Sequence, residues 1–352
     1  MALHHLHLEQ FRSYSQAMFT FNGGVNVIVG PNGIGKTNLL EAIYVVATGG
    51  SFRVSDKQLL QYNQQWFRVD ATFDDHERSL RYALEQTPAK KFFINGTHKK
   101  RITRDVRLPV VLFEPETLRM LTGSPTRRRA YLDTLLAEWY EDGTSLLRRY
   151  ERVLLQRNNL LKRAPTLSPQ TLDDQLFAWD VSLAELASII EEYRRAIVAK
   201  INQYFSEEYS RIASKASTVR LHYIASHAHS ESAYLHVLKE HRALDIARTH
   251  TTIGPHRSDF SVLLNGQPAE LTASRGEQRS IVLALKFIEM RELEAIRKQP
   301  PLLLLDDVMS ELDQTRQQQL LQKNHAQIIL TTAAVEALPL HAKAHTIKLA
   351  AV

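Results

Sequence analysis

Eight consecutive residues near the start of the chain have the types and spacing of a phosphate-binding loop. They follow the pattern G-x-x-x-x-G-K-[ST] and are Gly30, Pro31, Asn32, Gly33, Ile34, Gly35, Lys36 and Thr37. Glycines let backbone N–H groups turn inward around an anion, and a helix after the loop presents its positive end to the same anion. The pattern predicts that Lys36 reaches the β- and γ-phosphates of ATP, that Thr37 binds Mg²⁺, and that Asn38 completes the loop. A chance match in a glycine-rich turn is the alternative, but an apolar run at 25–29 and a helical pattern at 37–46 flank the motif.

Two adjacent carboxylates form the second group that could do chemistry. Asp306 and Asp307 directly follow the apolar run 301–305, which is typical of a buried strand. Ligands of α/β folds bind where such strands end, so Asp306 is expected to hold Mg²⁺ and Asp307 to orient or deprotonate the attacking water. With Lys36, these two residues are the expected catalytic set. Taken alone, the pair would fit a strand that simply ends in a turn.

A third motif lies just before a predicted helix and upstream of the acidic pair. It consists of Ser274, Arg275, Gly276, Glu277 and Gln278. It resembles the signature of ABC-type ATPases, in which the serine and glycine face the γ-phosphate of ATP held by the other subunit. Ser310 and Asp313 match the D-loop of the same class. The alternative for Ser274 is an ordinary N-cap with a polar first helical turn.

Three positions depart from the ABC pattern. Thr332 ends the strand expected at 327–332, where the class usually has a histidine, and Asp307 stands where the class usually has a glutamate. Both changes indicate slow turnover. No convincing Q-loop glutamine is found, because the expected segment, 113–116, contains Glu114 instead.

The remaining patterns predict the elements that position these motifs. Strands are expected at 66–73, 79–85, 219–224, 259–264 and 345–349, and helices at 127–163, 172–209 and 277–297. Pro165 and Pro169 separate the first two helical stretches, which indicates an antiparallel helical arm. The sequence thus predicts an α/β fold, an ABC-ATPase/SMC-type head formed by residues 1–114 and 246–352, with a mainly helical domain at 115–245 inserted in the chain.

Composition sets broad limits on the partners. The chain has 352 residues, a net charge of +6 and no cysteine, which excludes disulfides, thiolate catalysis and cysteine zinc sites. No signal peptide or apolar stretch of about 20 residues is found, so a cytoplasmic protein is expected.

The basic excess fits a polyanion partner such as DNA. Three clusters could neutralise backbone phosphates, or could be solvated faces: Lys99, Lys100 and Arg101 with Arg104 and Arg107; Arg127, Arg128 and Arg129; Arg148, Arg149 and Arg152. Because few aromatic residues lie among them, duplex-backbone contacts are favoured over base stacking.

Nearly the whole chain resembles the RecF family of bacterial recombination mediators, which are related to SMC proteins. The matching segments are residues 8–14, 51–53, 114–118, 123–133 and 254–257, together with the phosphate loop, the signature and the acidic pair. The resemblance implies a weak, DNA-stimulated ATPase that dimerises on ATP and binds DNA near single-strand to double-strand junctions. It also implies that RecO and RecR act with it to load RecA.

By similarity to SMC-type heads, Arg12 is expected to contact phosphate, or else to be a solvated arginine at a strand end. Two rivals stay open: a nucleotide-gated binding protein without significant catalysis, and the ATP-binding subunit of a membrane transporter. The long insert before Ser274 disfavours the transporter, and the length of the chain excludes a full SMC protein.

Overall fold

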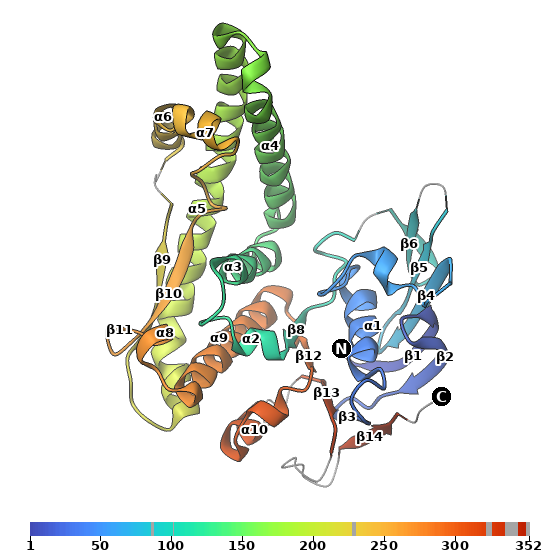
Figure 1. Ribbon diagram of the computed structural model, residues 1–352. Helices are drawn as coiled ribbons and strands as arrows, with labels where there is room; N and C mark the ends of the chain where they lie inside the picture. The colour runs from blue at the N-terminus through green and yellow to red at the C-terminus, as the bar shows by residue number, and fades with distance from the viewer. Residues whose placement is uncertain (86–87, 101, 227–229, 322–325, 335–343, 350–352) are drawn as a thin grey trace. The chain divides into compact units, whose positions relative to one another are not determined.

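A computed structural model of the chain describes residues 1–85, 88–100, 102–226, 230–321, 326–334 and 344–349 (Figure 1). The chain forms two compact units. The first contains Met1–Leu118 and Glu289–Val352, and the second contains Arg119–Ile288. Among the described helices, none combines the length and apolar character needed to cross a bilayer.

A five-stranded parallel sheet carries the phosphate loop and the acidic pair. Its strands lie in the order β14 (His345–Lys348), β3 (Val25–Val29), β13 (Ile328–Thr332), β12 (Leu302–Leu305) and β8 (Val110–Phe113). Every described pairing in it is parallel. The carboxyl ends of β3, β12, β13 and β8 therefore meet at one edge, which brings residue 30 and residue 306 together although they are far apart in the chain.

A six-stranded antiparallel sheet forms the other half of the first unit. Its order is β2 (Tyr14–Thr20), β1 (Leu3–Phe11), β4 (Trp66–Phe73), β5 (Glu77–Ala83), β6 (Ala89–Ile94) and β7 (Thr97–Lys99). Strands β1, β4 and β5 alternate buried and less buried residues, so one face of this sheet is apolar.

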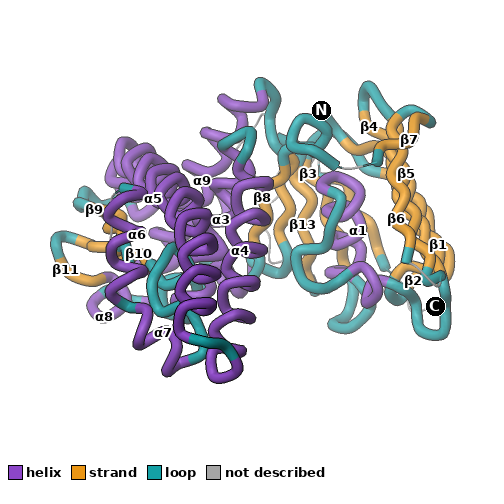
Figure 2. The backbone as a smooth tube through the Cα atoms, turned by 90° about the horizontal axis from the view of Figure 1, so that it is seen from above, coloured by secondary structure: helices purple, strands orange, loops and turns teal. Residues whose placement is uncertain are grey.

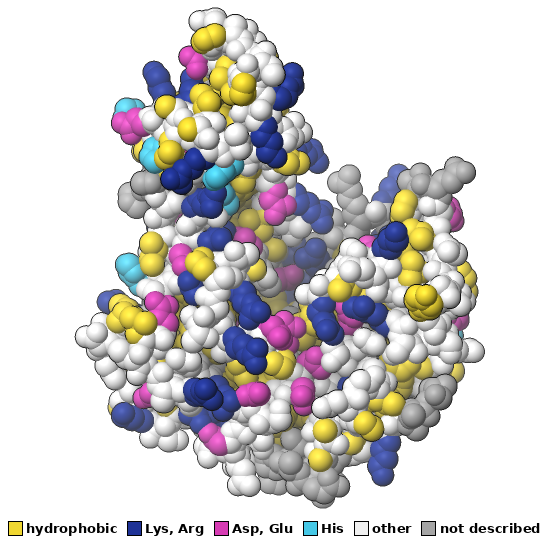
Figure 3. Space-filling view, in the orientation of Figure 1, with side chains coloured by type: hydrophobic (Ala, Val, Ile, Leu, Met, Phe, Trp, Pro, Cys, Tyr) yellow, Lys and Arg dark blue, Asp and Glu magenta, His cyan; other side chains and the backbone are white. Residues whose placement is uncertain are grey.

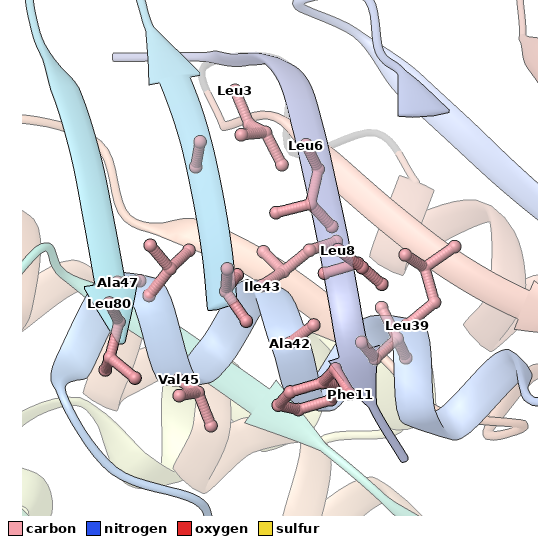
Figure 4. Packing of buried hydrophobic residues seen from close by; sticks show 14 of the residues in the cluster. Leu3, Leu6, Leu8, Phe11, Leu39, Ala42, Ile43, Val45, Ala47 and Leu80 are labelled. Carbon is pink, nitrogen blue, oxygen red and sulfur yellow. The ribbon is translucent and has the colours of Figure 1, made fainter. Parts of the chain in front are cut away.

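Helix α1 (Lys36–Thr48) packs between the two sheets and shares one core with them. Leu6 and Leu8 of β1 lie over Leu39 and Ile43 of the helix, and all four side chains are buried (Figure 4). Leu302 and Leu304 of β12 belong to the same cluster. The core thus fixes the first turn of α1, and with it the phosphate loop, against both sheets. The first unit also contains short helices η1 (Asp56–Leu59), α2 (Pro115–Leu118), η3 (Met309–Glu311) and α10 (Gln314–Leu321).

The second unit is mainly helical. Its helices are α3 (Pro125–Trp139), α4 (Gly143–Arg163), η2 (Ala164–Thr166), α5 (Pro169–Ala213), α6 (Glu231–Glu240), α7 (Arg242–Arg248), α8 (Ala269–Thr272) and the N-terminal part of α9 (Arg275–Arg297). Helices α4 and α5 pack side by side as an antiparallel pair, α4 coloured green and α5 yellow-green in Figure 1 (Figures 1 and 2). A small antiparallel sheet in the order β11 (Gln267–Pro268), β10 (Asp259–Leu264), β9 (Val219–Ile224) completes the unit.

Most predicted elements are confirmed, but one helix and one domain boundary differ. The helix expected at 127–163 is two helices, because Tyr140 to Asp142 leave the helical path and Gly143 begins α4. A Cβ at Gly143 would lie 2.2 Å from the Leu136 carbonyl oxygen, so only glycine permits this close turn. Residues 246–288, which the sequence assigned to the head, lie in the second compact unit, because β10 pairs with β9.

Candidate nucleotide-binding site

The phosphate loop joins β3 to α1 and depends on two glycines with positive φ. Gly33 has φ 84° and Gly35, the N-cap of α1, has φ 108°. A Cβ at Gly35 would lie 2.8 Å from the Ser13 hydroxyl oxygen and 3.0 Å from the Tyr14 hydroxyl oxygen. Tyr14 donates a hydrogen bond of 3.0 Å to the Gly35 carbonyl. Ser13 and Tyr14, at the turn between β1 and β2, therefore pack against the phosphate loop and support it.

Lys36 is held over the loop by backbone carbonyls. Its Nζ donates to the Gly30 carbonyl at 2.7 Å and to the Pro31 carbonyl at 3.0 Å, and the side chain is buried. Asn38, in the first turn of α1, donates from its amide to the Ser13 hydroxyl at 3.0 Å. The loop places a fixed ammonium group beside the N-terminus of a helix, which is the arrangement that binds phosphate.

Two threonine hydroxyls converge on the first carboxylate of the acidic pair. Thr37 and Thr331 each donate to Asp306 Oδ1 at 2.9 Å. The Thr331 hydroxyl oxygen also accepts the backbone N–H of Asp307 at 2.9 Å. Burial raises the pKa of Asp306, and the hydrogen bonds from the two threonines partly oppose that increase. The ionised carboxylate is thus costly here until a cation reaches it.

A cavity of about 310 Å³ opens at this edge of the parallel sheet. Its lining consists of Asn32, Gly33, Gly35, Lys36, Thr37, Asn38, Arg53, Asp306 and Asp307. The structure therefore brings the loop and the acidic pair together as the sequence predicted. Asp307 is exposed and has φ 52°, a left-handed conformation that turns it away from the strand path.

Sequence reasoning missed Arg53 and Thr331 as site residues. Arg53 belongs to the segment 51–53, which carries only the family resemblance, and no residue pattern points to it as a cavity residue. Thr331 lies one residue before the predicted H-loop position, and its role depends on the register of β13 beside β12. Thr332 instead lies opposite Val29 and forms hydrogen bonds with the backbone of Ala334.

Arg12 lies outside the cavity lining and pairs with a buried carboxylate. Its Nε and Nη2 donate to the two carboxylate oxygens of Glu41 at 2.8 and 3.0 Å, and the Ser51 hydroxyl donates to the same Glu41 at 2.5 Å. Glu41 lies on α1 and is fully buried. The structure thus shows that Arg12 joins the β1–β2 turn to α1 and is not simply a solvated arginine, whereas its contact with phosphate stays a prediction.

The predicted signature lies at the N-terminus of α9, where Ser274 and Glu277 form a capping box with each other. The Ser274 hydroxyl accepts from the Glu277 N–H at 3.3 Å, and the Glu277 carboxylate accepts from the Ser274 N–H at 2.9 Å. The Ser274 N–H and the Ser274 hydroxyl, which donates to the same carboxylate at 2.9 Å, lower the pKa of Glu277, the backbone N–H having the larger effect. Gln278 donates to the Ala273 carbonyl, whereas Arg275 and Gly276 occupy the first turn. Ser274 therefore caps the N-terminus of α9, and its side chain is exposed.

The predicted D-loop and Q-loop positions lie beside the acidic pair in the first unit. The Ser310 hydroxyl donates to the Asp307 carbonyl at 2.8 Å. Asp313 accepts the Arg316 N–H at 3.0 Å and so caps α10. Glu114 directly follows β8, whose last residue, Phe113, is opposite Leu305.

The basic clusters separate into exposed and buried members. Lys99, Lys100 and Arg127 are exposed, and Arg148, Arg149 and Arg152 are exposed on α4, where Figure 3 shows Lys and Arg side chains along the arm. Arg101 lies outside the described residues. Arg128 is buried and donates to both carboxylate oxygens of Asp259 at 2.7 Å, so it faces the interior and not a solvent-borne phosphate. Arg129 is partly buried and donates to the Ser258 carbonyl at 3.1 Å.

The donor set fits Mg²⁺ that arrives with a nucleotide. Within the described part of the chain no three His, Asp or Glu residues are grouped to hold a metal by themselves. Thr37 and Asp306 supply one hydroxyl and one carboxylate at the same point. Mg²⁺ prefers oxygen ligands and is commonly held by one or two protein groups together with phosphates and water.

Comparison with known proteins agrees with this geometry. The model of the RecF/RecN/SMC N-terminal domain matches residues 2–349. "DNA replication and repair protein RecF" of Heliobacterium modesticaldum is 37% identical, covering 96% of this chain and 94% of that protein. The protein of the same name from Lactobacillus johnsonii is 34% identical, with coverage of 96% and 93%.

The chain belongs to the RecF family.

Solved structures confirm the predicted fold class for this RecF-family chain. One described as "Structure of the recombination mediator protein RecF-ATPrS in RecFOR pathway" has a TM-score of 0.87 and 29% identity, covering 98% of this chain and 96% of that one. The corresponding RecF-ATP structure has a TM-score of 0.84 at 30% identity, with coverage of 94% and 92%. An SMC head bound to the C-winged helix domain of ScpA aligns with a TM-score of 0.54 at 17% identity, covering 96% of this chain and 90% of that one, and shows the fold alone.

Proposed function

We propose that this RecF-family chain is an ATP-dependent DNA-binding switch of recombinational repair and replication-gap processing. Each ATP would lie between two copies, held by the phosphate loop and acidic pair of one chain and capped by the signature of the other. ATP binding would close the dimer on DNA, and hydrolysis would release it. A γ-phosphate that contacts two chains stabilises only the closed state, which is what a population shift requires.

The main observation in support of this proposal is that Thr37 and Thr331 both donate to Asp306, in the same cavity as Lys36. Lys36 would exchange its contacts with loop carbonyls for contacts with the β- and γ-phosphates. Thr37 and Asp306 would hold Mg²⁺, which neutralises phosphate charge when bound. Because burial makes the charged form of Asp306 unfavourable, neutralisation of this carboxylate by Mg²⁺ would contribute to nucleotide affinity.

Asp307 is proposed as the group that orients or deprotonates the attacking water. It lines the cavity, and its N–H is fixed by Thr331. Its side chain is one methylene shorter than the glutamate usual in ABC enzymes, so we expect slow hydrolysis. The proposed activity is a weak ATPase that DNA stimulates.

The signature supports a second chain as the missing half of the site. Ser274 is exposed at the start of a long helix, and its hydroxyl forms hydrogen bonds with Glu277, three residues later. A helix N-terminus with an exposed hydroxyl is suited to an anion. The names of the solved RecF-ATP and RecF-ATPrS structures support ATP as that anion.

Exposed cations support DNA as the other ligand. Arg148, Arg149 and Arg152 on α4, with Arg127 at α3, could neutralise backbone phosphates without reading sequence. The relatives' name as DNA replication and repair proteins supports this ligand, and the RecFOR pathway named for the solved relative supports RecO and RecR as partners. Helping RecA to load on gapped DNA in the cytoplasm is the role that follows.

A nucleotide-gated binding protein without significant catalysis is the second candidate. The short Asp307 and the threonine at position 332 favour it, because both weaken the usual catalytic set. Turnover measured with and without DNA separates the two candidates.

Sedimentation velocity tests the proposed switch. The chain is run with MgATP, with MgADP and without nucleotide, each with and without gapped DNA. We expect a dimer only with MgATP and a shift of gapped DNA into the dimer peak. A monomer at saturating MgATP with DNA present contradicts the proposal.

A further inference from the structure

The six-stranded sheet of the first unit has a second face that no part of the nucleotide site uses. Helix α1 covers one face of this sheet, and no described helix packs on the other (Figure 2). A cavity of about 430 Å³ opens on that second face. Residues of β1, β4, β5 and β6 line it.

Three cations cross this face in direct register. Arg68 of β4 lies opposite Arg81 of β5, and Arg81 lies opposite Lys91 of β6. Like charges that face each other across strands destabilise a sheet. Arg68 is offset by Asp70 at 2.7 Å, but within the described chain no carboxylate pairs with Arg81 or Lys91. Two neighbouring cations that lack a carboxylate partner among the described residues favour an anionic ligand.

The carboxylates of the cavity lie mostly away from these two cations. Glu9 is opposite Arg68, on the β1 side, and is 3.5 Å from His7. Glu85 lies beyond the end of β5 and is exposed. The side formed by β5 and β6 is thus the part of the cavity that is most suited to a negative group.

Aromatic rings flank the cations on both sides along the strands. Trp66 is 41% exposed and is in register with Ala83, which faces Ala89, so small side chains leave space beside the indole. Phe93 is two residues beyond Lys91 on β6, and the Arg81 guanidinium lies over its ring, 5.4 Å from the centroid. Alternating rings and cations are suited to a ligand with alternating planar and anionic groups.

We propose that this face binds single-stranded nucleic acid, with a base stacked on the exposed Trp66, phosphates beside Arg81 and Lys91, and Phe93 positioning the Arg81 guanidinium. Unpaired bases can stack on exposed rings, whereas the bases of a duplex are already stacked on one another. A peptide would need closely spaced acidic residues to satisfy the same cations. The inference deepens the proposed DNA binding and rests on it for the ligand class, but it requires neither ATP nor a second chain.

Fluorescence anisotropy with a labelled 12-nucleotide oligothymidylate, without nucleotide, tests the site. We expect Trp66→Ala to weaken binding about tenfold, because one stacked base is lost. Trp66→Phe should restore most of the affinity. Arg81→Ala with Lys91→Ala should weaken binding and reduce the slope of log K against log salt by about 1.4, that is about 0.7 for each lost phosphate contact. Matched controls are Tyr62→Ala, an exposed aromatic, and Lys57→Ala, an exposed cation of the same unit.

The outcomes separate this inference from the proposed switch. Wild-type affinity in the Trp66→Ala and double variants would overturn the inference, even if MgATP still dimerises the chain. Binding of a glutamate-rich peptide that depends on Trp66, without binding of oligothymidylate, would overturn it in favour of a protein partner. Loss of MgATP-dependent dimers with unchanged oligothymidylate binding would overturn the proposed switch and leave the single-strand site standing.

Discussion

The two ends of the candidate ATP site are prepared in opposite ways. At the phosphate loop, side chains from α1, from β13 and from the end of β12 converge, and Asp306 receives two hydrogen bonds from residues 269 and 25 positions away in the chain. At the signature, Ser274 and Glu277 satisfy each other within a single helical turn and stay at the surface. The first end is assembled by the fold, and the second is only capped.

This difference indicates which interaction would supply the free energy for closing the proposed dimer. In the proposed switch, the loop end would bind MgATP within one chain, because its cation, hydroxyl and carboxylate are already in place. In the same proposal, the signature end would give up the hydrogen bonds between Ser274 and Glu277 before it contacts a phosphate. A bound triphosphate that offers several charged acceptors is the group that would make this exchange favourable.

Lys36→Ala should have the largest effect, because it breaks the prepared end. It removes the ammonium group expected on the β- and γ-phosphates, and each hydrogen bond to a charged group is worth about 1.5–3 kcal/mol. We expect ATP affinity to fall at least about a hundredfold and MgATP-dependent dimers to vanish. Isothermal titration calorimetry measures the affinity, with Lys57→Ala as control. Retained affinity would remove Lys36 from the site.

Asp307→Asn should separate binding from chemistry at the same end. We expect hydrolysis to fall by about 10² to 10⁴, the usual contribution of a positioned base, while ATP binding and dimers persist. Phosphate release in single-turnover assays measures the rate, and sedimentation measures the dimer. Hydrolysis at the wild-type rate would exclude Asp307 as the base.

Ser274→Ala should affect only the capped end. We expect unchanged ATP affinity of the monomer and a dimer weakened about a hundredfold, because each of two sites loses a hydrogen bond to a charged phosphate. The lost N-cap should also cost about 1 kcal/mol of stability. Ser230→Ala is the matched control, since Ser230 caps α6 by the same kind of hydrogen bond. Equal dimerisation by the two variants would contradict the role of the signature.

Asp306→Asn should have the smallest expected effect, a change in the melting temperature of the nucleotide-free chain. The sign of this change is informative. Because burial raises the pKa of Asp306, its contribution to folding is full below the ordinary aspartate value and is lost as pH rises through the folded-state pKa. The nucleotide-free variant should therefore melt above the wild type at neutral pH, with the difference disappearing in acid. MgATP should stabilise the wild type and not the variant. A lower neutral melting temperature for the variant would show that the carboxylate is not strained.

The sequence predicted the site where local pattern decides the structure. The loop spacing, the strand that ends just before Asp306 and the helix after Ser274 are short-range features, and all three are found. Contacts that depend on distant strands were missed. Thr331 reaches Asp306 only through the register of β13, and Arg53 lines the cavity from a loop without a motif.

The same limit explains the basic clusters. Arg127 and Arg128 are neighbours of the same type, yet one is exposed and the other is buried against Asp259, which is 131 residues away. A run of cations gives no sign of which member has a distant carboxylate. The cross-strand row of Arg68, Arg81 and Lys91 was likewise invisible, because these residues are separated in sequence and meet only in the sheet.

Mixing two inactive variants tests the shared site most directly. Lys36→Ala keeps an intact signature, and Ser274→Ala keeps an intact phosphate loop, so a mixed dimer contains one complete site. The account predicts that each variant alone hydrolyses MgATP poorly and that the mixture regains a substantial part of the wild-type rate. A mixture no faster than the sum of its two components would contradict a site built from two chains.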